Sequence, residues 1–198
     1  MRPELKYGLI GGAAIILWEL GEYLMGFHDV KIKWMPLIGL VAIFVPFIVL
    51  FFGILEKRKS MPGRFMTLRE GIKAGLIMAI LMASISGAFF YIYTVAINPN
   101  YLENRTEFVR KSMYDKLIAS NRAESPEQAR RVSIESSPIP THVGGAMYYV
   151  MLRTSIGLML SVLVSVVLRA NPPEGYREAL EAKENIDSIG EEEDDDES

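Results

Sequence analysis

Two long stretches without a charged residue constrain this chain more than any other feature. Trp34–Leu55 contains 22 such residues and Ala74–Ile97 contains 24. A helix needs roughly 20 predominantly apolar residues to cross the hydrocarbon core of a bilayer. Inside that core the backbone must satisfy its own hydrogen bonds, which favours a helix for each stretch. Both stretches therefore predict transmembrane helices, and an ordinary soluble domain is excluded.

Two further segments complete a predicted four-helix transmembrane domain over residues 1–170. The first is apolar apart from two glutamates, and the last carries a single arginine. A cleaved signal peptide is the alternative for the first segment, since cations precede its apolar run. No small-x-small cleavage site follows, so an uncleaved signal-anchor helix is favoured. The predicted fold class is an all-α integral membrane protein, with spans at about 7–27, 34–55, 71–97 and 144–168.

Residues 98–143, between the third and fourth spans, are too many for a structureless loop. Apolar residues recur at helical spacing between charges over residues 101–120, which predicts a helix there. The Ser125-Pro-Glu-Gln sequence is typical of a helix start and predicts a second helix to about residue 136. We predict an extramembrane helical hairpin. It is either a lid or partner surface, or, as favoured here, an amphipathic hairpin resting on the headgroups or on the end of the bundle.

The cations of the loops predict the orientation. Loop 56–70 contains five Lys and Arg residues, whereas loop 28–33 contains two. Cytoplasmic loops are enriched in Lys and Arg, so loop 56–70 and both termini are predicted to be cytoplasmic. Seven cations in segment 98–143 weaken the contrast, although long polar segments count less in this rule. The predicted location is the bacterial cytoplasmic (inner) membrane.

The C-terminal segment 171–198 differs in charge from the rest of the chain. From Glu174 onward it has 12 acidic and 2 basic residues, a net charge of -10, which leaves +7 on the remainder of a chain whose total is -3. Glu191–Glu197 is an unbroken acidic run. Such runs are usually solvated, so we predict a disordered cytoplasmic tail. A metal-binding or basic-partner role is the less favoured alternative.

Small residues recur at every fourth position of the third and fourth spans. They are Gly71, Gly75, Ala79, Ala83 and Gly87 in the third span, and Gly157, Ser161 and Ser165 in the fourth. Membrane helices associate by close packing over such residues. We therefore predict that the third and fourth spans pack together. Homodimerisation through the third span is the alternative.

Pro46 lies in the middle of the second span. It lacks a backbone donor, so a kink is predicted in this helix. Kinks occur in transporters but are common in membrane helices generally, so Pro46 alone is weak evidence for transport.

Glu19, Glu22 and Arg153 are the ionisable residues of the predicted spans that we consider as candidates for a site. Glu19 lies eight residues before the outer end of the first span, and Arg153 lies nine residues past the outer end of the fourth. At a rise of 1.5 Å per residue, both lie roughly 12–14 Å deep, so we predict that they pair. Glu22 is one turn nearer the surface and could share Arg153 or face water. The pair is either a proton relay or substrate anchor, or, as favoured here, a structural pair that fixes helix register.

His28 and His142 both fall at the predicted outer boundary. Imidazoles beside carboxylates could bind a transition metal or sense pH. The two residues are far apart in sequence and lack ligand spacing, so they are weak metal candidates, and no cofactor is predicted. The absence of Cys excludes thiolate catalysis and Cys-ligated metals.

No enzyme or nucleic-acid signature is present in the sequence. It contains no phosphate-binding loop, H-E-x-x-H, G-x-S-x-G or dinucleotide fingerprint, so a non-enzymatic protein is predicted. The cations are spread over membrane-flanking loops, which makes nucleic acid an unfavoured partner.

The third span and its flanks carry a resemblance. They read Met66-Thr-Leu-Arg-Glu-Gly-Ile-Lys-Ala-Gly, an apolar run, Tyr91-Ile-Tyr and then Ile97-Asn-Pro-Asn-Tyr-Leu-Glu103. A charged amphipathic segment, a Ser-Pro-Glu-Gln helix start and a Gly-bearing last span follow. This order, over roughly Tyr7 to Ala170, resembles the uncharacterised bacterial membrane family "domain of unknown function 4199". The resemblance implies four spans with an extramembrane helical segment between the third and fourth, and it implies no catalytic residue.

Two functions are therefore expected. The first is a non-enzymatic membrane interaction or accessory protein, with the lipid bilayer and a second copy or another membrane protein as partners. The alternative is a small oligomeric transporter or ion-coupled permease that uses Glu19 and Arg153.

Overall fold

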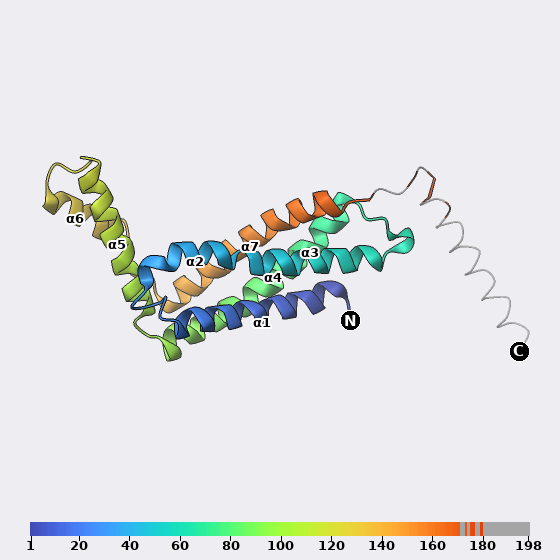
Figure 1. Cartoon of the computed structure of the whole chain (residues 1–198), viewed down its shortest axis with the longest axis horizontal. Helices are drawn as coiled ribbons and strands as arrows, with labels where there is room; N and C mark the ends of the chain where they lie inside the picture. Colours follow the sequence, from blue (N-terminus) through green and yellow to red (C-terminus); the bar gives the residue numbers. More distant parts are fainter. Residues whose placement is uncertain (171–172, 174, 177–178, 180–198) are drawn as a thin grey trace, which may run out of the picture.

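The computed structural model describes residues 1–170, 173, 175, 176 and 179, and these residues are helical with no strand (Figure 1). The predicted acidic tail, 171–198, lies almost entirely outside the described residues. A single antiparallel bridge joins Met66 to Ala170. The helices are α1 (Pro3–Leu24), α2 (Met35–Ala42), α3 (Phe44–Lys59), α4 (Leu68–Ile92), α5 (Tyr101–Ala119), α6 (Pro126–Glu135) and α7 (His142–Leu168).

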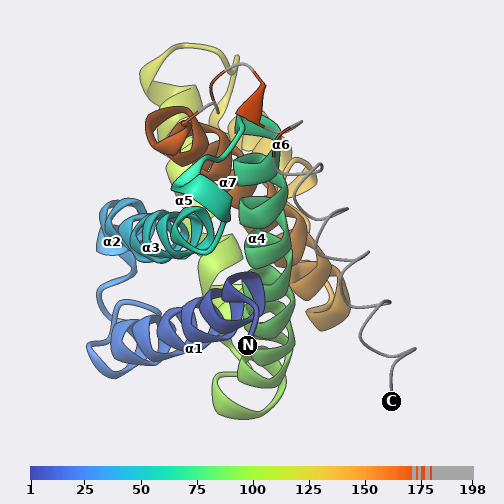
Figure 2. The same ribbon diagram turned by 90° about the vertical axis from the view of Figure 1, so that its right-hand side faces the viewer.

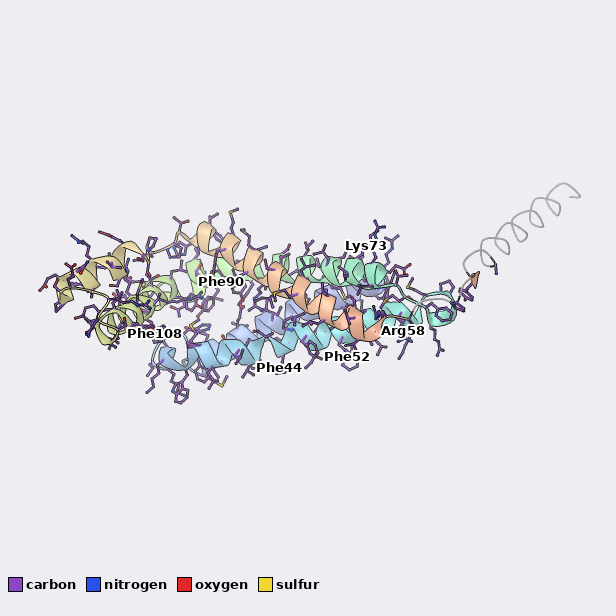
Figure 3. The ribbon with its side chains drawn as sticks, turned by 90° about the horizontal axis from the view of Figure 1, so that it is seen from above. Phe44, Phe52, Arg58, Lys73, Phe90 and Phe108 are labelled. Atoms are coloured by element: carbon purple, nitrogen blue, oxygen red, sulfur yellow. The ribbon has the colours of Figure 1, made fainter. Side chains whose placement is uncertain are left out.

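Within the described residues, three helical segments are long and apolar enough to cross a membrane. They are Ile32–Lys59, Leu68–Ile97 and His142–Leu168, with 28, 30 and 27 residues. Large apolar side chains along them face outward, including Phe44 and Phe52 (Figure 3). An outward apolar surface of this kind suits lipid rather than water, so these segments fit a membrane protein. They correspond to the second, third and fourth predicted spans.

Helix α4 is the centre of the helical bundle formed by α1, α3, α4 and α7. It lies between α1 and α7 and also contacts α3 (Figure 2). Thr67 begins the helix as its N-cap, with its hydroxyl accepting from the Glu70 amide and the Glu70 carboxylate accepting from the Thr67 amide. This reciprocal pair satisfies backbone donors that the first helical turn leaves free.

The small residues of α4 and α7 lie against one another. A Cβ atom added to Gly71 would lie 2.7 Å from the Ser165 hydroxyl oxygen, and one added to Gly157 would lie 2.5 Å from Ala79 Cβ. Gly75 likewise faces Ser161, whose hydroxyl donates to the Gly157 carbonyl oxygen at 2.6 Å. Ala83 is also buried, and Gly87 faces Val150. The stripe therefore packs within the chain, against α7.

The second apolar segment is interrupted near Pro46. Helix α2 ends at Ala42 and α3 begins at Phe44, with Ile43 between them. The carbonyl of Ala42 is the one that an N–H at position 46 would bond in a regular helix, and Pro46 has no N–H to donate. Ile43 instead donates to Leu40 in a tighter turn, at 3.3 Å.

Helices α5 and α6 form a hairpin that extends beyond one end of the bundle, opposite the α3–α4 connection (Figure 1). Ser125 is the N-cap of α6, and its hydroxyl accepts from the Gln128 amide at 3.2 Å. Helix α5 is connected to α4 through a π-helical turn at Tyr93–Ile97. At the base of the hairpin, Tyr101 and Leu102 are buried against the bundle.

Candidate functional site

The candidate site is a buried polar cluster where α1, α4 and α7 meet the base of α5. Glu19 of α1 and Arg153 of α7 form its first contact, with Oε1 2.8 Å from Nη2. Their side chains are only 9% and 19% exposed. The Arg153 guanidinium also lies 4.5 Å from the centre of the Tyr149 ring. The structure thus brings together Glu19 and Arg153, for which the sequence predicted similar depths in the membrane.

Glu22 has different partners from those that its sequence position suggested. One carboxylate oxygen accepts from the Trp18 indole N–H, and the other lies 3.1 Å from His28 Nε2. Among the described residues, Arg153 donates to Glu19 and not to Glu22. The reason is a chain reversal at Gly26, whose φ of 78° lies in the left-handed region that favours glycine. The reversal returns His28 to the last turn of α1, where it is 3% exposed.

A hydrogen-bonded series continues from His28 to the surface. The Tyr93 hydroxyl lies 2.6 Å from His28 Nδ1 and accepts from the Asn98 amide at 3.1 Å. Asp29 Oδ1 accepts from Asn98 at 3.5 Å and from Asn104 of α5 at 3.0 Å. Because Asn98 donates to Tyr93, the simplest consistent assignment has the Tyr93 hydroxyl donate to His28. The series therefore connects the buried His28 side chain to the exposed Asp29.

Aromatic rings enclose the polar groups. Tyr101 lies 4.8 Å from the His28 ring and 5.4 Å from the Tyr93 ring, measured between centroids. Phe90 stacks on Tyr149 at 4.6 Å. Burial raises the pKa of Tyr101, at the base of α5, to about 12, so its hydroxyl stays protonated at neutral pH. Burial of this kind strengthens the electrostatic interactions of the enclosed groups.

The two histidines have different surroundings. Both ring nitrogens of His28 are engaged, by Glu22 and Tyr93. His142 is the first residue of α7, and its Nδ1 has no hydrogen-bond partner in the described part of the chain. Within that part, no group of three or more His, Cys, Asp and Glu side chains could hold a metal ion. In the described part of the chain, the two histidines therefore do not share a site.

A second set of ion pairs joins α1 to α3 at the other end of these helices. Lys6 lies 2.8 Å from Glu56, which also accepts from the Tyr7 hydroxyl at 2.8 Å. Glu4 lies 2.8 Å from Lys57. Neither of these pairs was predicted from the sequence. Their only sequence signal is that both members of each pair lie at the cation-rich end of a predicted span.

The residues that sequence reasoning missed at the first cluster are Tyr93, Asn98 and Asp29. Tyr93 and Asn98 could be seen in the sequence as polar residues at the end of the third span, but the sequence did not predict that they contact His28 and Asp29. In the π-helical turn at Tyr93–Ile97 the backbone hydrogen bond spans five residues in place of four, and this changes the direction of the residues that follow.

Comparison with known proteins adds one match. The model of a family described as "Protein of unknown function (DUF4199)" matches residues 6–170, which are 165 of the 198 residues. The matched region contains the buried polar cluster, the hairpin and all three apolar segments. No curated protein and no solved structure matches the chain.

Proposed function

Since the chain belongs to this DUF4199 family of unknown function, we propose its role from its geometry: a four-span protein of the bacterial cytoplasmic membrane whose α5–α6 hairpin binds a protein partner. It acts as a non-enzymatic interaction or accessory protein. The observation that carries this proposal is the hairpin, which extends from the bundle and exposes aliphatic side chains between charged ones.

Helix α1 is the proposed fourth span. Its 22 residues are roughly 33 Å long at 1.5 Å per residue, about the thickness of the hydrocarbon core. Its glutamates at 19 and 22 point inward to the polar cluster. On its outward face, Leu9, Ile10 and Leu17 are 47%, 49% and 69% exposed. A helix that hides its charges and exposes its aliphatic side chains suits lipid contact.

The distribution of cations supports cytoplasmic termini. Six exposed cations gather where the N-terminus, the α3–α4 connection and the end of α7 meet. We call them the basic collar: Arg2, Lys59, Arg64, Arg69, Lys73 and Arg169. Lys73 and the neighbouring Arg58 lie at this end in Figure 3. An excess of cations beside membrane spans is typical of the cytoplasmic side.

Cysteine accessibility tests this topology, because the natural chain has no Cys. We expect a membrane-impermeant maleimide to label Val30→Cys and Ser120→Cys in intact spheroplasts. Arg2→Cys and Ser60→Cys should be labelled only after permeabilisation. Labelling of residues 2 and 30 from the same side would mean that α1 does not cross the membrane. Exchange of the two pairs would mean the opposite orientation.

The hairpin offers a surface suited to a protein partner. Helix α6 packs on α5 through Ala129, which is fully buried, and Arg110 Nε donates to the Ser137 carbonyl oxygen at 2.9 Å. These contacts hold the hairpin together without covering its outer side. Exposed aliphatic residues remain there among charges, as in the mixture of apolar and polar groups at protein interfaces: Val109, Ile118, Ile134 and Ile139.

Photo-crosslinking tests the partner surface. A benzophenone amino acid at Ile134, which is 45% exposed, should give one discrete adduct in living cells, identified by mass spectrometry. The same amino acid at Ser120, on the hairpin tip, is the matched control and should give little of that adduct. The charge reversal Arg131→Glu, beside Ile134, should reduce it. Equal adducts at both positions, or none at any of the four aliphatic positions, would contradict the proposal.

The buried cluster favours a second candidate, an ion-coupled permease. Glu22, His28 and Tyr93 follow one another in hydrogen-bond contact, and series of carboxylate, imidazole and phenol groups can pass protons. Glu19 and Arg153 would then be the coupling residues. This candidate predicts that Glu19→Gln abolishes proton-coupled flux in liposomes while the protein still folds. The accessory role predicts that the same variant keeps its partner adduct.

A further inference from the structure

We propose that the acidic run Glu191–Glu197 docks on the basic collar of its own chain. The tail thereby covers cations that would otherwise meet lipid headgroups or a partner. The inference does not depend on the proposed function or on the direction in which the chain crosses the membrane. It rests on unpaired charge at the collar and on the place where the tail begins.

The collar has surplus positive charge. In the part of the chain that the structure describes, no ion pair engages any of its six cations. The nearby acidic residues already have partners. Glu4 pairs with Lys57, Glu56 pairs with Lys6, and Glu70 accepts from Thr67 at the start of α4. An anionic ligand is therefore the chemistry that this surface lacks.

The structure holds the start of the tail within the collar. Ala170 and Met66 exchange two backbone hydrogen bonds, of 2.8 and 2.9 Å, between the end of α7 and the α3–α4 connection. Farther along, the Tyr176 ring packs edge-on against Phe65, with centroids 5.0 Å apart. Its hydroxyl also lies over Gly63, a position with φ of 62° that a side chain would fill. The tail thus leaves the bundle from the surface that carries the unpaired cations.

Reach and charge both fit docking. Glu191 is 15 residues after Tyr176, which gives an extended reach of roughly 50 Å. Tethering by so short a segment corresponds to an effective concentration in the millimolar range. Seven consecutive acidic residues face six cations, so the charges nearly balance. Anionic phospholipid headgroups are attracted to the same cations, but they have no tether at Phe65.

Distance measurement between two spin labels tests the proposal. Ser60→Cys lies in the α3–α4 connection and Ser198→Cys ends the tail, and no natural Cys interferes. In neutral phosphatidylcholine nanodiscs at low salt, we expect a narrow distribution of label-to-label distances. Its mean should be shorter than roughly 26 Å, the end-to-end distance of a free chain of the 22 residues that follow Tyr176. In 1 M salt, where the Debye length is about 3 Å, the distribution should lengthen and broaden.

Two variants and one lipid complete the test. Neutralising the run with E191Q, E192Q, E193Q, D194N, D195N, D196N and E197Q should give the broad distribution at every salt concentration. The pair Ser120→Cys and Ser198→Cys places one label on the distant hairpin. Its label-to-label distance should be long at every salt concentration. Persistence of the short distance in nanodiscs with one-third anionic lipid supports the tail as occupant. Its loss there would overturn the proposal in favour of lipid headgroups, and a salt-independent distribution in neutral nanodiscs would overturn docking itself.

Discussion

Arg153→Met is expected to lower the free energy of unfolding by about 3 kcal/mol, because it leaves Glu19 buried without its partner. The Glu19 residue is 7% exposed and its carboxylate accepts from Arg153 at 2.8 Å. Glu19→Gln should cost less, since the amide can still accept one hydrogen bond from the guanidinium. The double variant should be more stable than the sum of the two losses predicts, with a coupling energy above about 1 kcal/mol. Reversible unfolding in mixed detergent micelles measures all three.

A half-exposed pair provides the control for this cycle. Lys6 and Glu56 are 42% and 37% exposed, so Lys6→Met should cost far less than Arg153→Met. Small and nearly additive effects at residues 19 and 153 would contradict a structural pair. They would leave two buried charges without a structural explanation and would favour the permease.

Gly157→Leu is expected to separate α4 from α7 and to cost about 3 kcal/mol through overpacking. The added Cβ would lie 2.5 Å from Ala79 Cβ and 3.4 Å from Ala79 Cα, so no rotation of a neighbouring side chain can make room. The matched control is Gly39→Leu in α2, where no atom of a described residue lies within 4 Å of the added Cβ. That variant should change stability by no more than about 0.5 kcal/mol. The same unfolding titration compares the two.

Moving one methyl group across the interface makes this prediction sharper. Gly157→Ala alone should destabilise the protein, and adding Ala79→Gly should restore much of the loss, because the clashing methyl is then absent. Equal stability of Gly157→Leu and Gly39→Leu would show that α4 and α7 are not in close contact at this point. Homodimerisation through the α4 stripe would then become the better explanation for its small residues.

The sequence was most informative about segments that form one regular helix. Two charge-free stretches and one apolar stretch with a single arginine predicted the three segments that are long enough to cross a membrane, and the resemblance to the DUF4199 family is confirmed over residues 6–170. The depths of Glu19 and Arg153 followed from the helical rise alone, because each lies within an uninterrupted helix. Contacts between regular helices can be anticipated in this way.

Contacts that depend on irregular backbone could not be anticipated. Glu22 forms a hydrogen bond with His28 because the chain reverses at Gly26. The sequence has 16 glycines, and nothing in it predicts that this one lies at a chain reversal. Tyr93 reaches His28 beside a π-helical turn, which has no hydropathy signal. The projection of the hairpin likewise depends on this turn. Hydropathy therefore located three apolar segments, whereas the polar cluster between the helices required the structure.

The contact between Asn104 and Asp29 has a consequence for any partner of the hairpin. Asn104 lies in the first turn of α5, and Asp29 is joined through Asn98 and Tyr93 to His28. A tilt of the hairpin about its base changes the distance between Asn104 and Asp29. The hydrogen bonds that join Asp29 to Asn98, Tyr93 and His28 oppose this change. If a partner binds the hairpin as proposed and favours one tilt, we expect it to shift the packing of α1 and α4, and we expect that packing to alter the partner's affinity by the same factor.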